Sequence, residues 1–149
     1  MGTNYYLLSR HKKMVHKYFP DEYEYAEEPY LAYEIHLCKV SFGWKVLWEE
    51  HRNAYNSVEE LIEFVKKYNK WFKIYDEYSR LIPLDQFIED VVHRNERHER
   101  KLVDYEGVGK IWTPIDHVEI AERDMRTGYW MKYYHDKDGH DFTDSHFFA

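Results

Sequence analysis

Four side chains that could do chemistry stand close together in the segment IHLCKVSFGWK, residues 35–45: His36, Cys38, Lys39 and Ser41. His36 and Cys38 are two residues apart, so on a regular strand they share a face, where an imidazole could activate a thiolate. A lone cysteine on a strand is more often a small buried apolar residue. The segment is therefore interpreted as a recognition surface rather than a reactive one, and no catalytic residue is assigned.

A second group of chemically capable residues lies near the end of the sequence. Imidazole and carboxylate groups are common ligands of Zn²⁺ and other divalent metals. The group contains His135, His140 and His146, and a hairpin turn could bring two of its residues onto one ion. Aspartates accompany these histidines at Asp136, Asp138, Asp141 and Asp144. The spacing matches no metal-binding signature such as HExxH, and aspartates are common in turns for backbone reasons. We therefore predict no cofactor, with a divalent metal at the three histidines as the alternative.

Aromatic side chains are the main compositional excess, with 15 Tyr, 8 Phe and 5 Trp in 149 residues. Trp44 and Trp48 are four residues apart, hence on one face of a strand. Most rings should fill the core. Tyr and Trp also dominate protein interfaces and stack on flat ligands, so both tryptophans are included in the predicted recognition surface.

The elements that would position these groups follow from hydrophobic periodicity and turn residues. The Phe42-Gly43 pair is predicted as a hairpin turn, and a C-terminal hairpin should continue through Phe142. Residues 9–17 are interpreted as a linker or a helical turn, and 93–110 as a frayed helix end that leads into a loop. Strands are predicted at residues 4–8, 33–40, 45–49, 71–75 and 128–134.

Two amphipathic helices have clear signals. Ser57-Val58-Glu59-Glu60 is a capping box, in which Ser57 caps the amide of Glu60 and Glu60 reaches back, and it opens a helix over residues 57–68. Pro83 can occupy the first turn of a second helix, whose apolar face contains Leu84, Phe87, Ile88, Val91 and Val92. Helices with one apolar face cover a sheet. The sequence therefore predicts a single α+β domain over residues 1–149, with a mostly antiparallel sheet and two or three amphipathic helices packed on it.

Charge and cysteine content limit the function classes. The formal net charge is −7, from 28 acidic and 21 basic residues, so the overall field disfavours binding to DNA or RNA, although a local basic patch remains compatible with it. Cys38 is the only cysteine in the sequence, which excludes an intrachain disulfide and fits a reducing compartment. No apolar run approaches the ~18 residues of a membrane helix. We expect a cytoplasmic protein without a membrane segment.

Three segments of the chain resemble a group of small, uncharacterised bacteriophage and prophage proteins. MGTNYY at residues 1–6 is similar to their start, IHLCKVSFGW at 35–44 to their HIGKSSAGW-like hairpin, and IYDEYS at 74–79 to their DEYG turn. The resemblance covers residues 1–92. Cys38 and Ser79 stand where the family carries glycine, and the family's paired cysteines are missing, so no zinc knuckle is implied. The site residues that the resemblance indicates are His36, Lys39, Ser41, Gly43, Trp44, Asp76, Glu77 and Tyr78.

The resemblance implies a phage setting but no activity. With the acidity and the aromatic excess, it leads us to predict a phage-encoded accessory protein in the host cytoplasm. This protein would bind a host protein, and so inhibit a host defence system, as anti-CRISPR proteins do, or serve host takeover. The alternative is a protein that recognises a nucleotide or nucleic acid, with or without a metal: Lys39 and Ser41 would contact phosphate, His36 would act as acid or base, and Trp44 would stack. The sequence leaves the oligomeric state open, a homodimer included.

Overall fold

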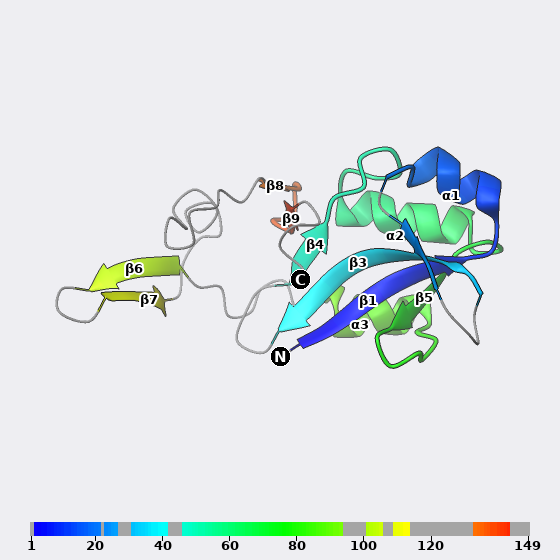
Figure 1. Ribbon diagram of the computed structural model, residues 1–149. Helices are drawn as coiled ribbons and strands as arrows, with labels where there is room; N and C mark the ends of the chain where they lie inside the picture. Colours follow the sequence, from blue (N-terminus) through cyan, green and yellow to red (C-terminus); the bar gives the residue numbers. More distant parts are fainter. Residues whose placement is uncertain are drawn as a thin grey trace.

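In the part of the chain that the structure describes, seven strands form one sheet with three helices packed against it, and two further strands pair with each other (Figure 1). This is the α+β architecture that the sequence predicts. The computed structural model describes the main chain of residues 2–21, 23–26, 31–41, 46–93, 101–105, 109–113 and 133–143. Side chains are described for the same residues except 101–105, 109–113 and 133–135.

The sheet has the strand order β5-β1-β3-β4-β9-β8, and β2 pairs with β3 beside this path. Neighbouring strands run antiparallel, except that β4 and β9 are parallel. The mostly antiparallel sheet is therefore confirmed. Its strands are β1 Gly2–Ser9, β2 Tyr23–Tyr25, β3 Tyr33–Ser41, β4 Leu47–Glu49, β5 Lys73–Asp76, β8 Tyr133–His135 and β9 Asp141–Thr143.

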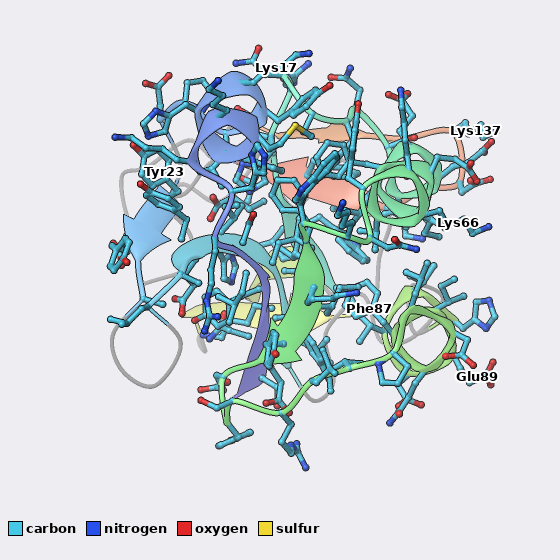
Figure 2. The ribbon with its side chains drawn as sticks, turned by 90° about the vertical axis from the view of Figure 1, so that its right-hand side faces the viewer. Lys17, Tyr23, Lys66, Phe87, Glu89 and Lys137 are labelled. Atoms are coloured by element: carbon cyan, nitrogen blue, oxygen red, sulfur yellow. The ribbon has the colours of Figure 1, made fainter. Side chains whose placement is uncertain are left out.

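The helices contribute their apolar faces to a common core. They are α1 Lys12–Tyr18, α2 Val58–Lys67 and α3 Leu84–Asp90. Seen end-on, they lie in an arc along one side of the central strands, and Phe87 points from α3 toward these strands (Figure 2). Phe19, Phe64 and Phe72 meet pairwise with 5.2 to 5.7 Å between ring centres, which suits edge-to-face contact. Aromatic rings thus fill much of the interior, as the composition predicts.

The start of α2 follows the predicted capping box with one difference. Ser57 Oγ accepts the backbone N–H of Glu60 at 3.0 Å. Glu60 reaches one residue further back than predicted, because its Oε1 accepts the N–H of Asn56 at 3.3 Å. A third cap comes from the C-terminal hairpin, where Asp136 Oδ2 accepts the N–H of Val58 at 2.9 Å. The helix start therefore holds the end of the described chain in place.

A β-bulge in the middle of β3 changes which side chains share a face. Consecutive residues of β1 pair with Cys38 and His36, so Leu37 is an extra residue in β3. An extra residue resets the alternation of side chains along a strand. Leu37 and Cys38 are consequently both fully buried, whereas His36 and Lys39 on either side are partly exposed. The prediction that His36 and Cys38 share a face is therefore wrong.

Three predicted boundaries also differ from the structure. Residues 9–17 contain most of α1, which begins after His11. Trp71 and Phe72 precede β5 because their N–H groups bond to the Tyr68 carbonyl and prolong the end of α2. The predicted loop after a helix end at 93–110 contains β6 Lys101–Tyr105 and the start of β7 Gly109–Thr113, two strands that pair with each other. The β-branched and aromatic residues of these two segments favour strands, although charged residues surround them in the sequence.

The C-terminal hairpin is confirmed, with β8 and β9 joined by a turn in which Gly139 has φ 83°. The predicted strand at 128–134 reaches the described residues in Tyr133 and Tyr134 alone. Among the helices that the structure describes, none is long and apolar enough to cross a membrane.

Candidate functional site

The three segments that carry the phage resemblance meet at Asn4. Its backbone N–H donates to Glu77 Oε1 at 2.7 Å, and its carbonyl accepts the N–H of Glu77 at 2.9 Å. Its side-chain Oδ1 lies 2.8 Å from Nε2 of His36, and the His36 ring meets that of Tyr6 edge-on with 5.4 Å between centres. Partners 32 and 73 residues away from Asn4 in sequence thus build one site. We name Asn4, Tyr6, His36, Glu49 and Glu77 the motif cluster.

Glu49 is a nearly buried carboxylate between two histidines. Its Oε1 lies 3.1 Å from Nδ1 of His36, and its Oε2 lies 3.4 Å from Nε2 of His51. His51 Nε2 donates to the backbone carbonyl of His36 at 2.7 Å. Burial lowers the pKa of each histidine to about 4. Both rings are therefore neutral near pH 7.

The neutral state limits the chemistry of His36. A neutral imidazole has one N–H donor and one acceptor nitrogen. Nδ1 and Nε2 of His36 each face an oxygen acceptor, on Glu49 and on Asn4, so the neutral ring donates to one of these two oxygens at a time. A general acid or base needs a nitrogen within reach of its substrate. The geometry favours a positioning role for His36, in which it holds β1, β3 and β4 together.

Cys38 has no nucleophilic character in this structure. The side chain is fully buried, and burial raises the pKa of its thiol well above the ordinary value. The thiolate is the reactive form of cysteine, so at neutral pH the residue packs as a small apolar group, as the sequence analysis favours.

The DEYS turn contains a structural carboxylate and an exposed rim. Asp76 is buried, and its Oδ1 accepts the backbone N–H groups of Tyr78 and Arg80 at 2.9 and 3.0 Å. Its Oδ2 accepts Nε–H of Arg80 at 2.7 Å. Ser79 has φ 65°, in the left-handed region that favours glycine, which accounts for glycine in the resembling turn. Asp76 thus fixes a turn on which Tyr78 and Leu81 are 63% and 56% exposed.

Carboxylates gather around Tyr6, on the side of the sheet that carries the motif cluster. Glu24 of β2 and Glu34 of β3 are direct cross-strand partners, and burial together with Glu24 raises the pKa of Glu34. Burial, assisted by Glu34, Glu77, Glu24 and Glu49, raises the pKa of Tyr6 to about 12. A hollow of about 190 Å³ opens here, which we name the acidic hollow. Its lining consists of Tyr6, Leu8, Glu34, Tyr75, Asp76, Glu77 and Ser79.

The remaining residues of the predicted hairpin site do not form one surface in the described residues. Lys39 and Ser41 are partly exposed on β3, beyond the bulge from His36. Trp48 is fully buried and packs against Phe142 with 6.2 Å between ring centres. Trp48 is therefore a core residue and not part of a recognition surface. Gly43 and Trp44 lie outside the described residues.

The predicted metal residues near the C-terminal turn have hydrogen-bonding roles. Asp136, Asp138 and His140 bring potential ligand atoms within 4.8 Å of one another. Asp136 Oδ1 accepts the N–H groups of Asp138 and His140, and its Oδ2 lies 2.9 Å from Nδ1 of His140. Burial opposes ionisation of Asp136, but hydrogen bonds from Val58 and His140 lower its pKa. These hydrogen bonds stabilise a turn, and the turn accounts for the proximity of the three side chains. His135 is described by its main chain alone and His146 lies outside the described residues, so the three-histidine site stays a prediction.

A second hollow, not predicted from the sequence, lies beside the acidic one. Its volume is about 440 Å³, and buried Leu8, Ser9 and Ala32 are among its lining residues. Two connections border it at the right-hand end of Figure 1, from β1 to α1 and from α2 to β5. We name it the basic hollow, after its charged and aromatic residues Arg10, His11, Lys70, Trp71, Lys73 and Tyr75.

A sequence signal for the basic hollow exists. The segments 10–20 and 64–75 contain eight of the 21 Lys and Arg residues and none of the 28 Asp and Glu residues. The structure packs these two segments together, because Tyr18 and Tyr68 place their hydroxyl oxygens 2.8 Å apart and the His11 and Trp71 rings lie 5.1 Å apart. A local excess of cations therefore exists in an acidic protein.

Comparison of the chain with protein families, with curated proteins and with solved structures finds no match. The resemblance to phage proteins rests on the three segments alone. A functional argument has to come from the motif cluster and the two hollows.

Proposed function

We propose that this protein acts by binding a protein partner through the acidic hollow. The proposal is carried by the direct pairing of Glu24 with Glu34 across β2 and β3. Like charges in directly opposed positions destabilise a sheet. Of this pair Glu34 lines the hollow, and Glu77 adds a further carboxylate to the lining. A lysine or arginine of a partner would relieve this repulsion on entering the hollow.

The rim of the acidic hollow offers apolar contact beside this charge. Tyr78 and Leu81 are exposed on the turn that Asp76 holds. Tyrosine is enriched among the residues that dominate interfaces, and a turn that is already ordered loses little entropy on binding. The partner surface that fits is a basic side chain flanked by apolar residues.

The resemblance to phage proteins supplies the biological setting. A phage-encoded accessory protein in the host cytoplasm, which inhibits a host defence protein or a host-takeover target, needs affinity and no catalytic group. The engaged nitrogens of His36 and the buried thiol of Cys38 support this role.

Affinity capture from a bacterial host lysate tests the proposal, followed by calorimetric titration of the captured partner. Glu34→Gln combined with Tyr78→Ser removes one charge and one rim ring, and should weaken binding at least about ten-fold. Tyr25→Ser is the matched control, because Tyr25 is 58% exposed on β2 and does not line the hollow. Equal affinity of the double variant and the wild type would contradict the proposal, as would the absence of any host protein bound at micromolar concentration.

A further inference from the structure

We propose that the basic hollow binds a nucleotide, with its phosphate groups on Arg10, Lys70 and Lys73 and its base against the ring of Trp71. This site is separate from the protein-binding role proposed for the acidic hollow. It also differs in position from the hairpin site that the sequence suggests for nucleotides, since none of His36, Lys39 and Ser41 is among the described residues that line it.

The size and charge of the hollow fit a small polyanion. Its volume of about 440 Å³ lies within the range of about 300–1,000 Å³ found for small-ligand sites. Among its described lining residues, Arg10, Lys70 and Lys73 are cationic and none carries a carboxylate. A hollow lined by charges of one sign concentrates the field and attracts the opposite charge. Three cations match the charge of a nucleoside diphosphate or triphosphate.

The aromatic residues favour a ligand with a flat ring over an inorganic anion. Trp71 is held in place by His11 and Tyr68, whose ring centres lie 5.1 and 6.0 Å from that of the indole. Lys70 Nζ lies 5.9 Å from the centre of the Trp71 ring. If the base of a nucleotide stacks on Trp71, the phosphates of that nucleotide would therefore meet the ammonium group of Lys70. Stacking on an aromatic face tolerates all bases, so we expect little base selectivity.

The framework of the hollow is rigid, which favours binding. Leu8 of β1 pairs with Lys73 of β5 in the sheet. Ser9 Oγ accepts the N–H of His11 at 3.1 Å and fixes the connection that leads into α1. A site built on ordered elements needs little reorganisation when a ligand enters.

The same chemistry, a base next to phosphate, can come from a free nucleotide or from a nucleic-acid strand. Basic and aromatic side chains continue beyond the hollow, with Lys17 Nζ 5.1 Å from the centre of the Tyr18 ring and Lys67 Nζ 5.2 Å from that of Tyr68. The experiment therefore includes both sources.

Calorimetric titration of the full chain with ATP is the first measurement. Lys70→Glu and Lys73→Glu should each weaken ATP binding about ten-fold or more, since each removes a charged contact to phosphate. Lys66→Glu is the matched control, because Lys66 is exposed on α2 and lies outside the hollow. The affinity of this variant for ATP should equal that of the wild type. Adenosine and pyrophosphate should each bind at least about ten-fold more weakly than ATP, because each lacks one half of the ligand. The proposal is overturned if ATP fails to bind at millimolar concentration, if Lys66→Glu weakens it equally, or if pyrophosphate binds as tightly as ATP.

Fluorescence and an oligonucleotide complete the test. ATP should quench tryptophan emission, and Trp71→Phe, which keeps a ring for packing, should lose this quenching. Quenching that persists in Trp71→Phe would place the base elsewhere and overturn the stacking contact. A single-stranded oligonucleotide could bind more tightly than ATP and lose this binding in Lys73→Glu. That result would support the basic hollow as the binding site and identify a nucleic-acid strand as its ligand.

Discussion

The acidic and the basic hollow share Leu8 and Tyr75, yet they carry opposite charge. In the acidic hollow, Glu34 of β3 is partly buried and directly opposes the carboxylate of Glu24 on β2. The cations of the basic hollow lie at the ends of elements and are exposed. Charge in the first hollow therefore costs the folded protein stability, whereas charge in the second is solvated and costs little. Each of the following predictions tests this difference, beginning with the largest effect.

Acidification should destabilise the protein through two histidines that contact Glu49, His36 of the motif cluster and its neighbour His51. The pKa of His36 and of His51 falls from 6.5 in the unfolded chain to about 4 in the folded protein. The unfolded state therefore binds more protons between these values. The free energy of unfolding should fall as the pH drops from 6.5 toward 4, by up to about 3 kcal/mol for each histidine. Urea unfolding at a series of pH values measures this slope.

Three substitutions identify the groups that cause the slope of the free energy of unfolding against pH. His36→Gln should flatten it, whereas His16→Gln, which removes an exposed histidine from α1, should leave it unchanged. Glu34 acts in the opposite sense, because its pKa is raised in the folded protein, so Glu34→Gln should steepen the fall. The same slope in His36→Gln and in the wild type would show that the motif cluster is not the source.

Removal of a carboxylate from the acidic hollow should distinguish structural from available charge. Asp76→Ala leaves the N–H groups of Tyr78 and Arg80 without their acceptor and should lower the free energy of unfolding by about 2–4 kcal/mol. Glu77→Ala, at an exposed position in the same turn, should cost less than about 1 kcal/mol. Urea denaturation compares the two variants. Similar costs would mean that both carboxylates hold the turn and that neither is reserved for a partner.

The smallest expected effect is a gain in stability. Ser79 occupies the left-handed region at φ 65°, which costs a residue with a Cβ about 1 kcal/mol. Ser79→Gly should therefore raise the free energy of unfolding by about 0.5–1 kcal/mol. Ser79→Ala keeps the Cβ and serves as the control. A thermal melt in which both variants gain equally would remove backbone strain as the explanation.

The parts of the fold that the sequence predicts well are those with local signals. Ser57 and Glu60 define the start of α2, and the turn before Gly139 defines the C-terminal hairpin. The bulge at Leu37 has no such signal, because it arises from the pairing of β3 with β1. One extra residue was enough to separate His36 from Cys38.

The candidate sites divide in the same way. The resemblance to phage proteins indicates His36 and Glu77, but it does not reveal that Asn4 joins them or that Glu49 lies buried against His36. Those contacts depend on which strands are neighbours. The basic hollow was not predicted from the sequence for another reason. The net charge of −7 is a sum over the whole chain, so it conceals two cationic segments that the fold brings together. A charge profile along the chain would have indicated it.

The parallel pairing of β4 with β9 has a consequence for the time course of synthesis. Leu47 pairs with Asp141, and the cap that Asp136 gives to Val58 spans 78 residues. At about 5–20 residues per second, a ribosome needs roughly 4–20 s to cover such a distance. During that interval the newly made β4 presents an open edge, and such edges recruit strands from other chains. Crowding of nascent chains on one messenger RNA should therefore favour association between chains at β4.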